Sequence, residues 1–215
     1  MKTINDYANT IIRGDCVEIM REMPSGCVDL IVTDPPYLVN YQSRDGRRVP
    51  NDNNDKWLEP AFAELYRVLR NDSFCISFYG WNKVDSFFRA WRKVGFYPVG
   101  HFVWVKDYHS SEAFVRYSHE CAYLLAKGRP LKPHTALRDV FEWQYTNNEL
   151  HPTQKPVMAL LPLILTFSSV GDVVLDPFGG SGTTALAAKQ LGRRYVGIEI
   201  DDKYCAAARK RLQSS

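Results

Sequence analysis

Two short segments combine residue types that could do chemistry on a bound ligand. Asp34-Pro35-Pro36-Tyr37 follows an apolar run at 28–33, and the glycine-rich segment from Asp176 to Thr184 (DPFGGSGTT) follows an apolar run at 173–175. Short apolar runs of this kind are typical of buried parallel strands. Open α/β sheets bind ligands beyond the carboxyl ends of such strands. If the two strands are neighbours, we expect both segments to face one crevice.

The first segment is suited to an amino group on a planar ring. Consecutive prolines fix φ and remove backbone donors, so the segment is rigid and its carbonyl oxygens can accept hydrogen bonds. The Asp34 carboxylate and the Pro35 carbonyl could each accept one N–H of an exocyclic amine, and the Tyr37 ring offers a face for stacking a base. The plainer alternative is a turn after a strand with Tyr37 in the core.

The glycine-rich segment indicates a nucleotide-like cofactor. Gly180-x-Gly182-x-x-Ala185 matches a pattern in which glycines let the backbone approach a ligand and then begin a helix. Glu199 ends the next predicted strand, where a carboxylate can accept hydrogen bonds from ribose hydroxyls. An adenosine-containing cofactor is therefore expected. The alternative is a tight turn, with Glu199 capping the last helix. Gly182 is followed by Thr183 rather than by Lys-Ser or Lys-Thr, which disfavours nucleoside triphosphate hydrolysis.

The elements that must position these segments alternate between strands and helices. Apolar periodicity predicts strands at 28–33, 73–79, 102–105, 120–126, 173–175 and 194–200, a further strand within 140–145, and helices at 58–69, 84–94, 155–168, 183–191 and 202–212. Such alternation predicts a mostly parallel sheet covered by helices on both faces. The runs at 102–105 and 120–126 have no helix between them, so we expect an antiparallel pair closing one edge.

Length and composition set limits on the class of protein. A length of 215 residues predicts one α/β domain. With 27 Lys and Arg against 24 Asp and Glu, its formal charge is +3. No apolar run reaches the roughly 20 residues needed to span a bilayer, and the first residues lack a secretory pattern, so a cytoplasmic location is expected. Five widely spaced cysteines without a C-x-x-C predict neither a disulfide framework nor a metal site.

The chain resembles a known family at several places. Asp34-Pro35-Pro36-Tyr37 looks like the catalytic motif of amino-methylating DNA methyltransferases, and Asp176 to Thr184 looks like their S-adenosylmethionine motif. The order of the motifs along the chain, with the catalytic motif first and the cofactor motif last, resembles that of the beta class of these enzymes, which is a circular permutation of the usual order. Further matches are Gly14-Asp15-Cys16, Trp104-Val105-Lys106, His119-Glu120 and His151-Pro152-Thr153-Gln154-Lys155-Pro156. Only 38–56 and 128–150 have no match.

The resemblance implies a Rossmann-like methyltransferase fold in a single domain over 1–215, with a mostly parallel seven-stranded sheet and an antiparallel edge. It implies a catalytic role for Asp34, Pro35, Pro36 and Tyr37. It also implies that S-adenosylmethionine is bound by Asp15 and Cys16 at the adenine, by Glu199 at the ribose, by Thr153 and Lys155 near the methionine carboxylate, and by Asp34, Asp176, Phe178, Gly179, Gly180, Ser181, Gly182 and Thr183 around the pocket.

Some of these residues have an alternative role. Asp15 with Glu18 forms a capping-box pattern, so a helix cap and a ligand contact are both open for Asp15. Lys155 is predicted to open a helix, where a positive charge is unfavourable to the helix dipole, and a ligand role is preferred for it. For His151, a hydrogen bond to the backbone is the plainer role.

The resemblance also implies the reaction. Asp34 before Pro-Pro-Tyr is similar to members that methylate adenine N6, whereas serine there is more usual for N4-cytosine enzymes, which are the alternative. The chain has no Pro-Cys, so C5 methylation is not expected. A paired target base must be flipped out of the duplex and held by stacking. A nicotinamide-dependent oxidoreductase would leave Asp34 to Tyr37 and His151 to Pro156 unexplained.

The expected partner is double-stranded DNA, and the resemblance further implies a homodimer. We predict DNA contacts from basic residues in the polar loop at 38–56 and in a small target recognition segment at 107–150, together with the lysine just before it: Arg44, Arg47, Arg48, Lys106, Arg116 and Lys132. Between the edge strands and His151, only about 23 residues remain for reading bases, so we expect a short or relaxed recognition sequence, because base readout needs a helix or ribbon in the major groove.

Overall fold

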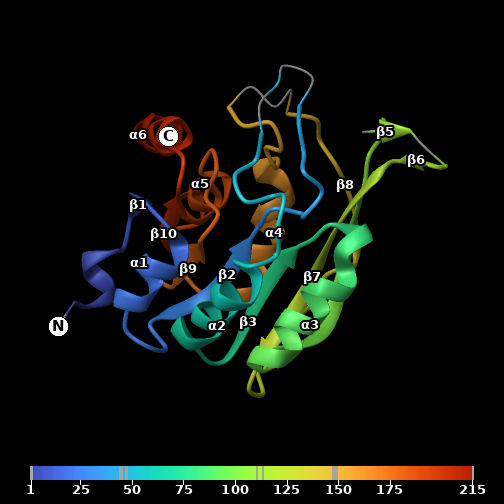
Figure 1. The fold of residues 1–215 in the computed structure, drawn as a ribbon. Coiled ribbons are helices and arrows are strands. Elements are labelled where there is room, and N and C mark those ends of the chain that lie inside the picture. The colour runs from blue at the N-terminus through green and yellow to red at the C-terminus, as the bar shows by residue number, and fades with distance from the viewer. Residues whose placement is uncertain are drawn as a thin grey trace.

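The fold is built on one twisted sheet that runs through the molecule (Figure 1). The computed structural model describes residues 2–43, 46, 48–109, 111–112, 114–146 and 150–214. In this part of the chain the main sheet has eight strands in the order β1-β10-β9-β2-β3-β7-β4-β8. Their bounds are β1 Thr10–Arg13, β2 Val28–Thr33, β3 Leu69–Phe78, β4 Tyr97–Val105, β7 His119–Lys127, β8 Val140–Glu142, β9 Val173–Asp176 and β10 Arg194–Glu199.

The mostly parallel α/β sheet predicted from the sequence is confirmed. Strands β1, β10, β9, β2 and β3 pair in parallel, whereas β7 runs antiparallel to both β3 and β4. The sheet has eight strands rather than the seven expected. The β4–β7 pair was expected to form one edge of the sheet, but β8 forms it instead, because β8 pairs in parallel with β4. Among the eight strands described, only β7 runs in the opposite direction. The carboxyl ends of the other seven therefore lie at the same end of the sheet.

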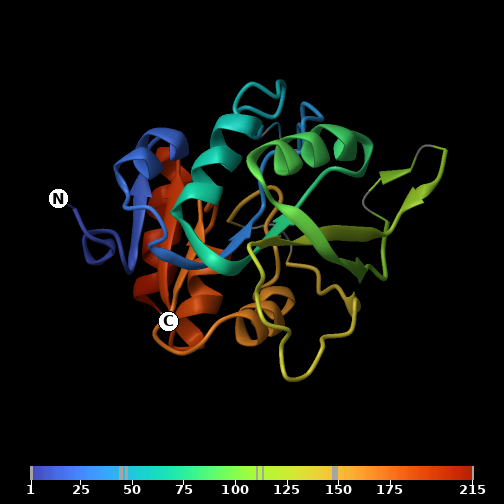
Figure 2. The same ribbon diagram turned by 90° about the horizontal axis from the view of Figure 1, so that it is seen from below.

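Helices cover both faces of the sheet in two layers, as Figure 2 shows from below. Helices α1 (Cys16–Glu22), α2 (Leu58–Val68) and α3 (Val84–Val94) pack on one face, and α4 (Val157–Phe167), α5 (Thr183–Gln190) and α6 (Asp202–Gln213) pack on the other. Short 3-10 turns lie at Ile4–Asp6 and Trp81–Lys83. Each layer has its own apolar core, with Phe62 and Trp91 fully buried in the first and Leu163 and Ile164 in the second.

Two element boundaries differ from the sequence prediction in ways that affect the site. Helix α4 begins at Val157 with Pro156 as its N-cap, so Lys155 precedes the helix instead of opening it. Strand β1 was not predicted, because its four residues contain only two apolar side chains, Ile11 and Ile12. It pairs with β10 at the edge of the sheet.

The loop at 38–56 and a hairpin within 107–150 lie outside the main sheet. In the loop at 38–56, the described part is organised around the buried Asp52, whose carboxylate accepts hydrogen bonds from the backbone N–H of Leu38 at 2.7 Å and of Tyr41 at 2.6 Å. Within 107–150, a small hairpin of β5 (Ser111–Glu112) and β6 (Arg116–Tyr117) projects from the body of the molecule (Figure 1). Among the described residues, no helix has the length and apolar character to cross a membrane.

Candidate functional site

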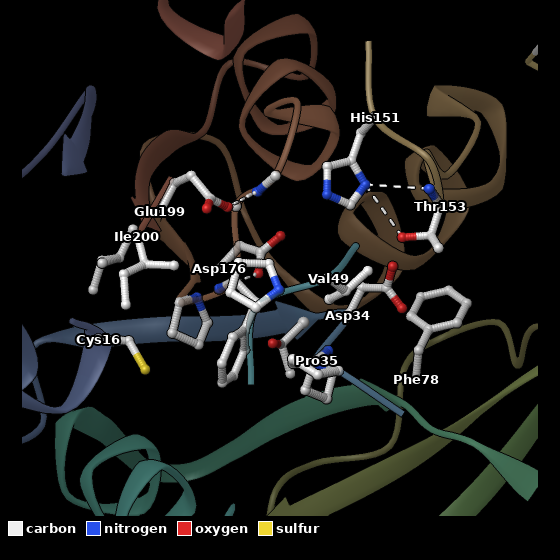
Figure 3. A pocket seen from close by; sticks show the side chains of 18 of the residues that line it. Cys16, Asp34, Pro35, Val49, Phe78, His151, Thr153, Asp176, Glu199 and Ile200 are labelled. Atoms are coloured by element: carbon white, nitrogen blue, oxygen red, sulfur yellow. Dashed lines mark hydrogen bonds between the residues drawn. The ribbon is translucent and has the colours of Figure 1, made fainter. Parts of the chain in front are cut away.

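The two chemical segments meet because their strands are neighbours. Strand β2 pairs in parallel with β9 through Leu30 opposite Val174 and Ile31 opposite Leu175. Both strands therefore end at the same edge of the sheet, and the residues that follow them line one pocket (Figure 3). The walls of this pocket come from the β2 corner, the glycine-rich loop, the start of α1 and the 151–155 segment. The expected shared crevice is confirmed.

Most of the predicted site residues line this pocket. The lining includes the whole corner Asp34-Pro35-Pro36-Tyr37 and every predicted cofactor residue except Gly182. Gly182 has φ of +77°, and a Cβ there would lie 2.9 Å from the Cβ of Ala208 in α6. Glycine at this position lets the loop turn into α5 while α6 packs directly behind it.

The Glu199 carboxylate fastens the glycine-rich loop to the end of β10. Its Oε2 accepts a hydrogen bond from the Gly180 N–H at 2.7 Å, and its Oε1 accepts one from the Asp201 N–H at 2.8 Å. Burial raises the pKa of Glu199, against these two backbone donors. The N-cap of α6 is Asp201, not Glu199, so the alternative interpretation of Glu199 as a helix cap is wrong.

Asp176 is a second carboxylate that the local chain holds in place. Its Oδ2 accepts from the Thr184 hydroxyl at 2.7 Å, and its Oδ1 accepts from the Phe178 N–H at 3.1 Å. Burial raises the pKa of Asp176 to about 7, despite these hydrogen bonds. A nearby positive charge would therefore be stabilised in this part of the pocket.

The start of α1 and the 151–155 segment close the pocket at its sides. Asp15 is the N-cap of α1 and accepts from the Val17 N–H at 2.8 Å and the Glu18 N–H at 3.2 Å, which confirms the predicted cap. The His151 ring accepts from the Thr153 N–H at 3.3 Å through Nδ1, as its plainer interpretation required. Cys16 lies beside Asp15 on the wall, and burial raises the pKa of its thiol to about 12.

A cluster of side-chain charges surrounds the Tyr37 hydroxyl. The Lys155 Nζ lies 2.7 Å from Asp34 Oδ2 and 3.2 Å from the Tyr37 oxygen. The Tyr37 hydroxyl lies 3.0 Å from Asp34 Oδ1 and 3.3 Å from Glu120 Oε2 and donates its hydrogen to this pair of acceptors. The Lys155 ammonium, expected beside a cofactor carboxylate, is thus paired with the aspartate of the corner.

Glu120 and Lys106 complete the cluster from the β4–β7 side. The Lys106 Nζ lies 2.5 Å from Glu120 Oε1, and the Lys155 Nζ lies 3.9 Å from Glu120 Oε2. Lys106 was expected to contact DNA phosphates, but it is only 7% exposed and its charge is held by Glu120, so that assignment is wrong. The sequence had placed Glu120 in a family-like block without giving it a role.

The four charged groups of the cluster balance one another. Burial opposes the charge of Lys155, but the carboxylates of Asp34 and Glu120 outweigh this effect and raise its pKa. Burial also disfavours the Glu120 carboxylate, but Lys155 and Lys106 outweigh it and lower its pKa. For Asp34, burial prevails over Lys155 and raises the pKa. Lys155 therefore favours the ionised form of Asp34, in opposition to burial.

The remaining predicted DNA contacts lie outside the pocket. Arg48 is exposed in the loop that follows the β2 corner, and Arg116 is exposed on β6, where its Nε lies 3.3 Å from Glu112. Lys132 is exposed. It follows the carboxyl end of β7, which lies at the end of the sheet away from the pocket because β7 is antiparallel to β3. Arg44 and Arg47 lie outside the described residues.

Comparison with known proteins identifies the family. The family model described as DNA methylase matches residues 28–210, which is most of the chain and includes both chemical segments. The chain therefore belongs to the N6/N4 family of DNA methylases.

Individual relatives agree with this assignment. The candidate methylase YubD of Escherichia coli (strain K12) is 53% identical over 201 residues, covering 94% of this chain and 88% of YubD. The type II methyltransferase M.HinfI of Haemophilus influenzae is 28% identical, covering 99% of this chain and 70% of M.HinfI. This family membership and these relatives define the chain as a DNA methyltransferase.

Solved structures have the same fold. A complex of M1.HpyAVI with S-adenosylmethionine has a TM-score of 0.76 at 25% identity and covers 94% of this chain and 98% of its own. The cytosine-N4-specific PvuII DNA methyltransferase has a TM-score of 0.74 at 16% identity, with 97% of this chain and 93% of its own covered, and so shows the fold alone.

Proposed function

We propose that this DNA methyltransferase transfers a methyl group from S-adenosylmethionine to the N6 amine of an adenine flipped out of double-stranded DNA. The observation that supports this most directly is the single pocket in which the Asp34 corner faces the glycine-rich loop. One wall is suited to an amine and the other to an adenosine-containing molecule. The N6 target, rather than cytosine N4, follows from aspartate before Pro-Pro-Tyr, which resembles the adenine-methylating members.

The residues of the pocket fit S-adenosylmethionine by shape and charge. The glycine-rich loop and Glu199 both line the pocket, and we propose that the loop backbone approaches the cofactor while the Glu199 carboxylate also accepts from its ribose hydroxyls. Asp34, Asp176 and Glu199 make the pocket acidic, which suits the positive sulfonium and ammonium groups of this cofactor. When bound, the cofactor supplies an electrophilic methyl group on sulfur.

The corner makes the target amine a better nucleophile by accepting its hydrogens. An adenine N6 amine is a poor nucleophile because its lone pair is delocalised into the ring. If the Asp34 carboxylate and the Pro35 carbonyl each accept one N–H, the nitrogen is favoured in a pyramidal form with its lone pair directed at the methyl group. This is catalysis by positioning and electrostatic complementarity, and it needs no covalent intermediate.

Tyr37 supplies the stacking surface for the flipped base. Its hydroxyl is fixed by Asp34, Glu120 and Lys155, so the orientation of its ring is set before a base arrives. The Lys155 Nζ is 5.2 Å from the ring centroid but only 3.2 Å from the hydroxyl oxygen, so the ammonium lies beyond the hydroxyl end of the ring. Lys155 therefore does not cover the ring face on which an extruded base is proposed to stack.

DNA contacts are proposed on the pocket side of the molecule. Arg48 in the loop after the corner and Arg116 on the projecting hairpin are exposed cations suited to phosphates, and Arg44 and Arg47 are proposed from the sequence alone. Lys132 is the weakest candidate because it lies toward the other edge of the sheet. The small recognition segment at 107–150 supports a short or relaxed recognition sequence. A homodimer also stays a prediction from family resemblance.

Mapping of methylated bases tests the proposed reaction. Unmethylated genomic DNA is incubated with the protein and S-adenosylmethionine, and N6-methyladenine and N4-methylcytosine are quantified by mass spectrometry and located by single-molecule sequencing. We expect N6-methyladenine within a short sequence. N4-methylcytosine as the main product would replace the proposal with the alternative target, and calorimetry in which NAD rather than S-adenosylmethionine binds would reject methyl transfer altogether.

The role of Asp34 is tested by removing its carboxylate. Asp34→Ala should lower methyl transfer by about 1,000-fold or more, because the acceptor for the target amine and the partner of Lys155 are both lost. Binding of S-adenosylmethionine measured by calorimetry should change by only a few fold. Near-normal transfer by the variant would show that Asp34 does not act on the amine.

A further inference from the structure

The charge cluster presents an ordered set of hydrogen-bonding groups at one end of the Tyr37 ring. The Lys155 ammonium contacts Asp34 Oδ2 at 2.7 Å and Glu120 Oε2 at 3.9 Å, so a donor lies between two acceptors. All three groups lie within 3.3 Å of the Tyr37 hydroxyl oxygen. A base stacked on this ring, with its amine at Asp34, would direct an edge toward the same set.

The two candidate target bases differ at one position of that edge. Next to the amine, adenine has the ring acceptor N1 and cytosine has the ring acceptor N3, and either can accept from an ammonium. The next position is a C–H in adenine but the O2 carbonyl in cytosine. The sequence acceptor, donor, acceptor formed by Asp34, Lys155 and Glu120 therefore matches adenine at each step. With cytosine, the carboxylate of Glu120 would meet a second acceptor with no hydrogen between them.

Glu120 is held so that it cannot easily turn away or become a donor. Its Oε1 is paired with the buried ammonium of Lys106 at 2.5 Å, and its Oε2 faces Tyr37 and Lys155. Lys106 and Lys155 lower the pKa of Glu120 despite its burial, so the group stays a carboxylate and has no proton to offer to a carbonyl. A fixed acceptor facing a carbonyl leaves both groups without a partner, which is the kind of mismatch by which sites reject a wrong substrate.

We propose that Glu120, which lies next to Tyr37 and Lys155 of the pocket, is a specificity-determining residue that selects adenine over cytosine by opposing the O2 carbonyl of a cytosine whose amine is held at Asp34. Lys106 acts through it as a positioning residue. The inference rests on the proposed function, because it assumes that adenine is the target. The proposal gives Glu120 on β7 a role in choosing the base, in addition to the role proposed for the Asp34 corner after β2 in binding the amine.

The test compares two targets in one sequence context. After the wild-type site has been mapped, duplexes are made with adenine or with cytosine at the target position, each opposite an abasic site so that neither base is paired. Values of kcat/KM for methyl transfer are measured for the wild-type protein and for Glu120→Gln. The glutamine amide can donate to O2, so we expect the adenine-to-cytosine ratio of kcat/KM to fall by about tenfold or more.

Controls separate specificity from folding. Loss of folded protein lowers both rates equally and leaves their ratio unchanged, so the ratio reports on discrimination alone. Glu22→Gln, an exposed glutamate on α1 paired with Lys2, should leave the ratio at its wild-type value. If Glu120→Gln does not fold because Lys106 is left unpaired, the double variant Lys106→Met with Glu120→Gln removes both charges and should show the same fall.

The outcomes distinguish this inference from the proposed function. Wild-type transfer to adenine with an adenine-to-cytosine ratio that Glu120→Gln lowers supports both. Wild-type transfer to adenine with a ratio that changes less than twofold in Glu120→Gln and in the double variant overturns the role of Glu120 and leaves the adenine target standing. Wild-type preference for cytosine overturns the proposed target and, with it, the inference.

Discussion

The two sides of the pocket hold their carboxylates by different means. On the cofactor side, Asp15 and Glu199 accept hydrogen bonds from backbone N–H groups, and Asp176 accepts from one backbone N–H and one threonine hydroxyl. On the target side, Asp34 and Glu120 are held by the side chains of Tyr37, Lys155 and Lys106. One side is built from local chain geometry and the other from ion pairs between distant segments.

This difference suits the two ligands of the proposed function, a cofactor and a target base. Backbone donors are fixed by secondary structure, so the cofactor side has a constant shape that a recurring ligand can use without rearrangement. The ion pair of Lys155 with Asp34 can give way to a hydrogen bond from an arriving amine, so Asp34 can serve as an N–H acceptor while Lys106 keeps Glu120 in place. The same feature makes the target side more sensitive to loss of a single residue, because a removed partner leaves a buried charge unpaired.

The largest test of this contrast removes the shared ammonium. Lys155→Met leaves Asp34 and Glu120 as buried carboxylates without Lys155, so we expect a loss of about 3–5 kcal/mol in the free energy of unfolding above pH 7. Because Lys155 lowers the pKa of Asp34, its removal should raise that pKa. The acidic limb of the pH profile of kcat/KM should then move to higher pH.

A matched variant shows whether these effects come from the pocket. Lys127 is also a buried lysine, but its ammonium donates to the carbonyls of Tyr66 and Leu69 at 2.6 Å, far along the chain from the site. Lys127→Met should lower stability without moving the pH profile. If Lys155→Met left the acidic limb in place, the dependence of Asp34 on Lys155 would be disproved.

On the cofactor side, removing a buried carboxylate is expected to increase the free energy of unfolding rather than lower it. The pKa of Asp176 is raised to about 7 in the folded protein, so its ionisation disfavours folding as the pH rises above its ordinary value of 3.8. Asp176→Asn should therefore stabilise the cofactor-free protein by on the order of 2–4 kcal/mol at pH 8, with a gain that disappears below about pH 4.

The same substitution should weaken the cofactor. A carboxylate that stabilises a cationic group contributes about 1.5–3 kcal/mol, so calorimetry should show the affinity of Asp176→Asn for S-adenosylmethionine reduced by at least about tenfold. Chemical denaturation across pH 4 to 8 measures the stability change. A variant that is less stable at pH 8, or that binds as tightly as the wild type, contradicts this account of Asp176.

The smallest effect is expected at the start of α1. Asp15→Ala should cost about 1 kcal/mol, because the N-cap of α1 is lost, whereas Asp15→Asn keeps an acceptor and should cost less than about 0.5 kcal/mol. A fall of a few fold in cofactor affinity for Asp15→Asn would sharpen the assignment of Asp15 as cap and ligand together. Asp201→Asn, the corresponding cap of α6, provides the comparison.

Local patterns predicted most of the fold, and their limits follow from the same physics. Helix α3 and strand β2 were located from periodicity because each has a continuous buried stripe. Strand β1 has too few residues to show a period, and its pairing with β10 at the other end of the chain leaves no local signal. The adjacency of β2 and β9 could only be stated as a condition for the same reason.

The cofactor side of the site was predictable, whereas the charge cluster was not. The glycine-rich loop and Glu199 lie within 25 residues of one another in a recognisable pattern. The cluster draws Asp34, Lys106, Glu120 and Lys155 from four separate segments. One signal was nevertheless present: an antiparallel pairing of the two predicted strands that sets Trp104 opposite Glu120 brings Lys106 beside Glu120 as well. This strand register would have predicted that Lys106 pairs with Glu120 and is not a surface residue.

The pairing of β2 with β9 also affects the order in which the chain can become active during synthesis. Leu30 emerges from the ribosome long before Val174, its partner in the sheet. Until then one edge of the central strand has unpaired backbone groups that could join another chain. The nascent protein therefore carries the Asp34 corner without the wall that completes the pocket, and methyl transfer must await the synthesis of β9 and the glycine-rich loop after it.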